Sequence, residues 1–428
     1  MSMAMSTYRA IFANREFRNL WLSSALGNAS ATMTSLTLAI VVDAATGSAL
    51  LAAAIMFGPS LAQVLGLSTL MSAADTARPR RILTLLAVLT AVEVGVQAAF
   101  DLSPVVRLGL ALALAYGLSI GSGVRWGLLG EVLGTDQFVL GRSAMNLSVG
   151  AMQIAGFGIA GILLQAVSAS TVLWIATGFA AVSVPVIRLG LRDRAPRRVA
   201  RTSLAETWRA NRLLLAQRRT RPLLLALALP NGLIVGCEAL FVPYAGSRAG
   251  WLLAAGAAGM MTGDLVVGRF LTREGRRIAG QGLRFVLAVP FLGFAFDLPI
   301  AVLCVLVAIG SSGYSASLAQ QEVLVDLTPL DLRGQVLGLE GALRTTTFGV
   351  VAILAGALAD LTATAPAIAV FAAASLLTSI VLTRPLHRVM RPSGWIGSPH
   401  DDGRPAECLQ AVRATGDPDG SRPAGECG

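Results

Sequence analysis

The sequence contains no lysine: all 34 of its basic residues are arginine. The phosphate-binding loop of P-loop ATPases, G-x-x-x-x-G-K-[ST], requires a lysine, which excludes ATP-driven chemistry of that type within this chain. Histidine is scarce, with two residues, and the four cysteines lack metal-ligand spacing. Neither a nucleophile with its base nor a metal cluster can be assembled from residues at one depth. We therefore predict neither an enzyme nor a bound cofactor or metal.

Charged residues are also few, at 14% of the chain against 54% hydrophobic residues, and the mean hydropathy is +0.68. Apolar runs this long exclude a soluble globule and indicate a polytopic membrane protein. The formal net charge is +10, but the arginines lie in short connections between apolar runs, where the positive-inside rule explains them. Nucleic-acid binding is therefore not expected.

Apolar stretches of membrane length occur along most of the chain. A helix needs about 20 apolar residues to cross the hydrocarbon core, and Pro, Gly and charge clusters mark the breaks. The predicted spans are Leu20 to Val42, Leu50 to Met71, Ile82 to Phe100, Val105 to Leu129, Ser143 to Val167 and Thr171 to Ile187, then Leu223 to Ala245, Trp251 to Leu271, Leu283 to Phe296, Ile300 to Gln320, Val336 to Ala359 and Ala365 to Thr383. The predicted fold class is an all-α membrane protein with twelve transmembrane helices in two six-helix, pseudo-symmetric halves.

An arginine-rich connector separates the two halves. The N-terminal bundle is residues 1–187, the connector is 188–222 with eleven arginines, and the C-terminal bundle is 223–384. Residues 385–428 are rich in Pro and Gly and are predicted to form a disordered tail. Because arginines gather in the connector and in the loops after spans 2 and 8, both termini are predicted to be cytoplasmic, in a multi-pass protein of the inner (plasma) membrane.

Two loops, one in each half, have a similar pattern of Gly or Pro residues and paired arginines. The loop after span 2 reads Asp75-Thr-Ala-Arg78-Pro-Arg80-Arg81, and the loop after span 8 reads Gly268-Arg-Phe-Leu-Thr272-Arg273-Glu-Gly275-Arg276-Arg277. Glu131-Val-Leu after span 4 recurs as Glu322-Val-Leu after span 10. Echoes at similar offsets indicate one duplication.

These loops resemble the signature of the major facilitator superfamily, roughly G-x-L-A-D-R-x-G-R-R between helices 2 and 3, repeated more weakly between 8 and 9. The run from Phe17-Arg-Asn-Leu-Trp21 through Thr46-Gly-Ser48 is similar to the bacterial branch of drug and macrolide exporters. The first loop keeps the acid at Asp75, whereas the second has Thr272 in its place. The resemblance implies a cytoplasmic gating motif, comprising Asp75, Arg80, Arg81, Asp264, Gly268, Arg273, Arg276 and Arg277.

The gating motif has a physical rationale. A carboxylate such as Asp75 is stabilised at a helix N-terminus by the helix dipole and unpaired N–H groups, and neighbouring arginines hold helix ends and lipid phosphates. Such contacts would latch the cytoplasmic side of a two-state transporter. The alternative is that the arginines are only topology signals.

Ionisable groups at membrane depth are the main candidates for a site, because they are costly in hydrocarbon and usually face a wet cavity. The resemblance implies that helices 1, 4, 7 and 10 line that cavity. Glu238 in span 7, with Asn231 on the same helical face, is the first candidate for proton or cation handling. The alternative is a fixed carboxylate paired with an arginine or a backbone group.

Other polar residues on these helices have two interpretations each. Arg125 in span 4 could bind an anionic substrate or form a structural ion pair. Span 1 carries Asn28, Thr32 and Ser35 on one face, which indicates either cavity lining or helix–helix hydrogen bonding. Ser311 and Ser315 in span 10 are consistent with substrate contacts or with close packing.

The function expected from these features is secondary active transport by alternating access, most simply proton-coupled efflux of a small amphipathic molecule such as a drug or secondary metabolite, by an antiporter. The expected partners are a small-molecule substrate, protons or another coupling ion and the lipid bilayer, with the monomer as the functional unit. An importer of a small metabolite and a non-transporting membrane sensor or scaffold remain alternatives.

Overall fold

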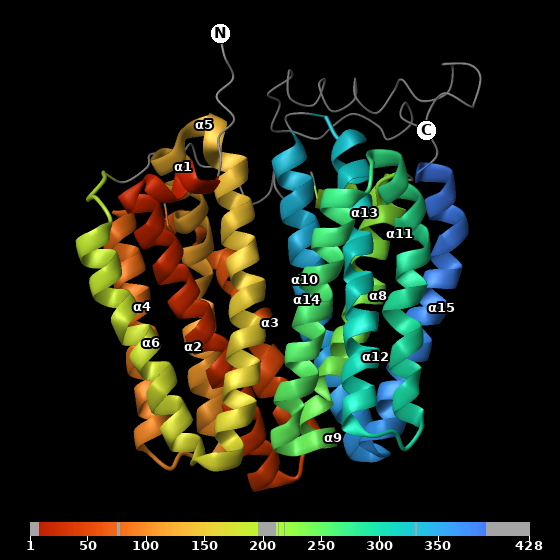
Figure 1. The fold of residues 1–428 in the computed structure, drawn as a ribbon, viewed down its shortest axis with the longest axis horizontal. Coiled ribbons are helices and arrows are strands. Elements are labelled where there is room, and N and C mark those ends of the chain that lie inside the picture. The colour runs from red at the N-terminus through yellow and green to blue at the C-terminus, as the bar shows by residue number, and fades with distance from the viewer. Residues whose placement is uncertain are drawn as a thin grey trace, which may run out of the picture. The chain divides into compact units, whose positions relative to one another are not determined.

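A computed structural model describes residues 8–74, 78–195, 211–212, 214–217, 219–329 and 332–390. Across these residues the regular structure is helical, and eleven helical stretches are long and apolar enough to cross a membrane (Figure 1). Asp75, most of the arginine-rich connector and the tail beyond Met390 lie outside the described residues.

The N-terminal half contains a short helix and five long ones. They are α1 (Tyr8–Ala13), α2 (Arg15–Thr46), α3 (Ala49–Ala74), α4 (Pro79–Ala99), α5 (Pro104–Ala166) and α6 (Ala169–Gly190). Helix α5 holds two spans, because Gly134 adopts a φ of 68° and kinks it. That left-handed conformation suits glycine, which has no Cβ to clash. The spans on either side are Pro104–Gly134 and Leu140–Ala166.

The C-terminal half is more interrupted. Its helices are α8 (Arg221–Ala239), α9 (Phe241–Ala245), η1 (Gly246–Arg248), α10 (Ala249–Phe270), α11 (Arg273–Ala288), η2 (Val289–Ala295), α12 (Ile300–Ser312), η3 (Gly313–Ser315), α13 (Ala316–Asp326), α14 (Arg333–Leu361) and α15 (Thr364–Met390). The stretch Arg221–Phe270 is too long for one crossing and breaks at Gly246, where φ is 56°. Dividing it there gives twelve spans, six in each half, and the predicted fold class is confirmed.

Local sequence explains where the helices begin and end. The Asn14 side chain accepts hydrogen bonds from the N–H groups of Glu16 and Phe17, which caps α2. Gly47, at a φ of 63°, ends the same helix in the left-handed conformation typical of a helix C-terminus. Pro79 occupies the first turn of α4, where its missing N–H costs nothing.

Two helix pairs make most of the contact between the halves: α3 packs against α14, and α5 packs against α10. The second pair meets at Gly161 and Gly250, where a Cβ on Gly250 would lie 2.6 Å from the Gly161 Cα. Small residues allow this backbone approach in place of side-chain packing. One apolar cluster, which includes Met33 and Phe241, draws residues from both halves.

The helices of each half have two ends that differ in charge. We call the end that carries the loops after α3 and α10 the basic end, since Arg78, Arg80, Arg273, Arg276 and Arg277 lie there. The other, the far end, carries the turn between α2 and α3 and the turn between α14 and α15. Helix α11 begins at Arg273 rather than near the predicted Leu283, because its first turns are amphipathic and pair with acids on α13.

Candidate functional site

A polar cluster connects α8 with η3 and α13 in the C-terminal half. The Tyr314 hydroxyl donates to Oε1 of Glu238 at 3.3 Å and to the carbonyl oxygen of Asn231 at 3.5 Å. The Asn231 amide donates to the Ser317 hydroxyl at 3.0 Å and to the Leu227 carbonyl at 2.9 Å. The two residues predicted to share a face of span 7 therefore meet the same partner element.

Glu238 has no arginine partner among the described residues. It is half-buried, and the Tyr314 hydroxyl is the described group that donates to its carboxylate. A Cβ added at Gly256 on α10 would lie 4.0 Å from Oε1, so α10 passes close by. A carboxyl group at membrane depth without a cation is the kind of group that exchanges protons in transporters.

The short 3-10 segment η3 shapes the cluster. Gly313 lies against α11, where an added Cβ would lie 2.6 Å from the Leu283 carbonyl oxygen and 2.7 Å from the Leu287 Cα. Because a 3-10 turn has a tighter repeat than an α-helix, it changes the face on which the following side chains lie. The segment places Tyr314 toward α8, and the Ser315 hydroxyl donates to the Ser312 carbonyl of its own turn at 2.7 Å.

Ser311 differs from Ser315 in its bonding. Its hydroxyl is buried and has no described partner, and a Cβ on Gly256 would lie 3.3 Å from it. Ser311 and Glu238 therefore both lie near Gly256 of α10, while the Ser315 hydroxyl bonds to a backbone carbonyl.

The predicted polar stripe of span 1 bonds mainly to backbone. The Thr32 hydroxyl donates to the carbonyls of Asn28 at 2.8 Å and Ala29 at 3.1 Å, and it lies 3.4 Å from the carbonyl of Met152 on α5. The Ser35 hydroxyl donates to the Thr32 carbonyl. The Asn28 side chain has no described partner and is half-buried. Helix–helix bonding thus accounts for Thr32, whereas Asn28 is free to meet a ligand.

Arg125 lies within a span of the N-terminal half and has no ion pair among the described residues. Its Nε is buried and forms no described hydrogen bond, and no described acid pairs with it. The neighbouring Trp126 receives a different cation, since the Arg142 guanidinium carbon lies 5.5 Å from its ring centre. A structural ion pair for Arg125, one of the two interpretations of the sequence, does not occur among the described residues.

The loop arginines of the C-terminal half form a network with α13. Arg276 donates to both carboxylate oxygens of Glu322 at 3.2 Å, and Arg273 pairs with Glu322 at 2.9 Å and also with Asp326. Arg277 lies 3.3 Å from Asp326. Gly268 has open space at its Cβ position. Asp264 interacts electrostatically with Arg344 of α14, which is paired with the buried Glu340 at 3.2 Å.

The loop arginines of the N-terminal half pair with a different element. Arg78 donates to Asp193, beyond the end of α6, at 2.7 Å, and Arg80 lies 3.5 Å from the same carboxylate. The hydrogen bond from Arg78, and then the charges of Arg78, Arg80 and Arg81, hold the pKa of Asp193 below its usual value. Arg194 binds Glu16 and lies 3.3 Å from Glu131, and its hydrogen bond with Glu16 raises the pKa of Arg194.

The sequence identified several charged and polar residues of the site and loops, but not the residues to which they bond. Tyr314 and Ser317 were not among the predicted site residues, although both are polar and three positions apart in a predicted span. Asp193 and Asp326 were also missed. Helical periodicity identifies residues on one face, but it does not indicate which helix that face meets.

Comparison with solved structures identifies the fold. A point mutant of the nucleoside transporter NupG superposes with a TM-score of 0.73 at 13% sequence identity, covering 86% of this chain and 99% of that one. A POT family transporter bound to a thioalcohol-conjugated peptide gives 0.71 at 10% identity, covering 88% and 97%. The peptide transporter POT in complex with sulfate gives 0.70 at 12% identity, covering 90% and 99%.

No family profile and no curated protein sequence matches the chain. The structural neighbours share the major facilitator fold, and this chain has that fold: twelve membrane-spanning helices in two six-helix halves. The fold that the predicted resemblance implied is confirmed.

Proposed function

We propose that this protein is a secondary active transporter that carries a small molecule across the membrane by alternating access of its two halves. The observation that carries the proposal is Glu238, a carboxyl group within a membrane span that bonds to Tyr314 and has no cationic partner in the described part of the chain. In this proposal Glu238 takes up and releases the coupling proton, while Asn231, Ser311 and Arg125 contact the substrate. Asn28, Thr32, Ser35 and Ser315 complete the cavity wall.

Export of a small amphipathic molecule is the direction we propose, on the likeness of the N-terminal run to drug exporters. Uptake is the second candidate, and it fits structural neighbours that are named as a nucleoside transporter and a peptide transporter. Cells expressing the wild type or Glu238→Gln would be compared for sensitivity to a broad compound panel and for accumulation of labelled compounds. Export predicts lowered sensitivity and accumulation with the wild type alone, and uptake predicts the reverse. Equal values in wild-type and empty-vector cells across the panel would contradict transport.

The membrane orientation is part of the proposal. The positive-inside rule places the basic end, with Arg80, Arg81 and Arg276, on the cytoplasmic side of the plasma membrane. Cysteines substituted at Arg80 and at Arg198 should then react with an impermeant thiol reagent only after the membrane is opened. Labelling of either position in intact cells would overturn this orientation.

A further inference from the structure

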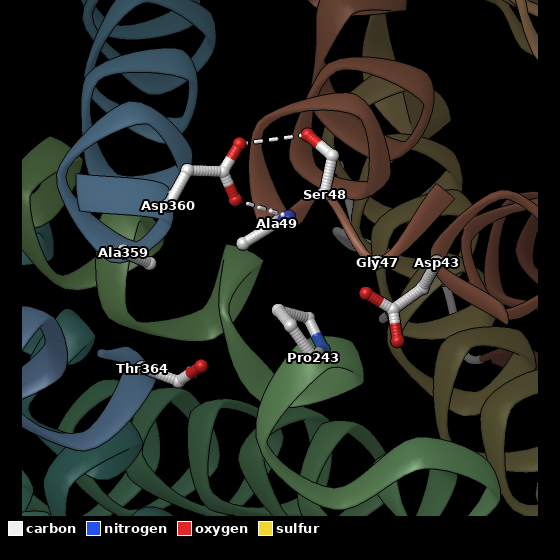
Figure 2. A pocket seen from close by; sticks show the side chains of 8 residues that line it. All are labelled: Asp43, Gly47, Ser48, Ala49, Pro243, Ala359, Asp360 and Thr364. Atoms are coloured by element: carbon white, nitrogen blue, oxygen red, sulfur yellow. Dashed lines mark hydrogen bonds between the residues drawn. The ribbon is translucent and has the colours of Figure 1, made fainter. Parts of the chain in front are cut away.

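At the far end, a carboxylate of the C-terminal half caps a helix of the N-terminal half. Asp360, in the last turn of α14, accepts hydrogen bonds from the Ser48 hydroxyl at 2.7 Å and from the backbone N–H of Ala49 at 2.6 Å (Figure 2). It also accepts one from the backbone N–H of Leu50 at 3.4 Å. These N–H groups begin α3 and have no partner within their own helix. Asp360 therefore satisfies them, and its negative charge lies at the positive end of the helix dipole.

The backbones of α3 and α14 meet closely at the same place. A Cβ added at Gly356, one turn before Asp360, would lie 2.6 Å from the Leu50 Cα and 2.8 Å from the Ala49 carbonyl oxygen. Real Cβ atoms do not approach that closely, so glycine at this position is what lets the carboxylate reach α3.

The far end differs from the basic end in what its polar contacts join. At the basic end, the ion pair of Arg78 with Asp193 joins the N-terminal half to the start of the connector, and the ion pair of Arg276 with Glu322 stays within the C-terminal half. Between described residues of residues 1–187 and 223–384, every hydrogen bond from one half to the other is accepted by Asp360. Between described residues of the two halves, hydrogen bonding is thus found at the far end.

We propose that Asp360 is the gate residue of the far end: its carboxylate holds the two halves closed there, and it must release the start of α3 when the cavity opens to that side. This inference rests on the proposed alternating access. Asp360 lines a pocket of about 430 Å³ with Asp43, Ser48, Pro243 and Thr364 (Figure 2). Water in the pocket reaches the exposed carboxylate and replaces its partners when the halves separate.

The test is a distance measurement across the seam on the full-length protein in lipid nanodiscs. Spin labels would be attached to cysteines at the exposed positions Ala45 and Leu361, in a chain without its native cysteines. Hydrogen bonds to a charged acceptor keep a net stabilising effect after the competing bonds to water are subtracted, so their loss in Asp360→Ala should favour the separated state. The ratio of long to short distances between the two labels should then rise by about tenfold. Asp297→Asn, which changes an exposed acid at the same end without a described partner, is the matched control and should leave the ratio unchanged.

Two further variants keep the test decisive. Should Asp360→Ala fail to fold, Asp360→Asn removes the charge alone and should shift the distances in the same direction. Gly356→Ala should also lengthen them, because its methyl group collides with Leu50. Unchanged distances in the Asp360 variants would overturn the gate even where transport is measured. A shift in distances without transport of any compound would instead keep the gate and contradict the proposed function.

Discussion

The two halves share a helix plan but use their polar residues differently. In the N-terminal half the described hydroxyl groups of Thr32 and Ser35 bond to backbone carbonyls, and the long helices run without 3-10 breaks. In the C-terminal half Glu238 and Asn231 bond to side chains of another element beside the interruption at η3. Interrupted helices at the midplane are where transporters of this kind place their sites.

This difference indicates that the two halves have different roles. Among the described residues, the N-terminal half places one arginine without an ion pair, Arg125, inside a span, while the C-terminal half holds the carboxyl group proposed to exchange protons. The halves then meet along α3 with α14 and α5 with α10, where glycine contacts and Asp360 set how they join.

The largest expected difference is in transport, when one carboxyl group within a span is replaced in each half. Glu238→Gln should abolish proton-driven transport, because an amide cannot carry the proton. Glu93→Gln is the matched change in the N-terminal half, where Gln97 donates to Glu93 at 2.6 Å. It should leave transport intact in proteoliposomes with an imposed pH gradient. Equal losses in both variants would remove the proposed asymmetry between the halves.

The next largest effect is expected on stability, when a methyl group is added where Gly161 of α5 meets Gly250 of α10. Gly250→Ala places a Cβ against Gly161, and overpacking of this kind costs about 1–3 kcal/mol. The control is Gly109, which lies in α5 with open space around its Cβ position. Gly109→Ala should therefore be neutral or slightly stabilising. Thermal unfolding of the purified proteins measures both. An unchanged midpoint for Gly250→Ala would mean that the seam contributes little to holding the halves together.

Loss of a single hydroxyl should have a smaller effect. Tyr314→Phe removes the bond to Glu238, and a net hydrogen bond is worth about 1 kcal/mol, so transport should fall about fivefold at subsaturating substrate. The control is Tyr116→Phe in the N-terminal half, whose hydroxyl lies 2.8 Å from that of Thr69. Initial rates should separate the two variants. If Tyr116→Phe is the more damaging, the site has been placed in the wrong half.

Removal of an exposed ion pair should have the smallest effect on stability, and that effect should depend on pH. The folded-state pKa of Asp193 is lowered by Arg78, so its contribution to stability is present above the unfolded pKa of about 3.9 and is lost as the pH falls through the folded pKa. Asp193→Asn should therefore lower the unfolding midpoint slightly at pH 7 and not at about pH 2. A larger loss at acid pH than at neutral pH would contradict the Arg78 pairing.

Much of the fold follows from sequence because membrane spans are set by length and hydropathy, which are local properties. The boundaries were less predictable. Arg276 and Arg277 looked like a loop but belong to α11, since Glu322 and Asp326 on α13 compensate their charges. The predicted spans Val105 to Leu129 and Ser143 to Val167 are both present, but their facing ends extend to Gly134 and Leu140, where the backbone kinks at Gly134.

The candidate site was predictable in part. Glu238 and Asn231 stood out because charged and amide side chains are rare in apolar spans. Tyr314 did not, because the 3-10 turn at Gly313–Ser315 changes the face that α-helical spacing assigns to it. Asp360 was not among the predicted residues, because only the packing of α14 on α3 gives it Ala49 and Leu50 as partners.

Carbodiimide labelling tests the central claim, that Glu238 is a proton-exchanging carboxyl group inside the membrane, without knowledge of the substrate. The apolar reagent reacts with protonated carboxyl groups within the bilayer, and mass spectrometry of the digested protein locates the adduct. We predict modification at Glu238 that declines as the pH is raised, with none at Glu340, which is buried against Arg344. An unmodified Glu238 at every pH, with the protein folded, would contradict the claim.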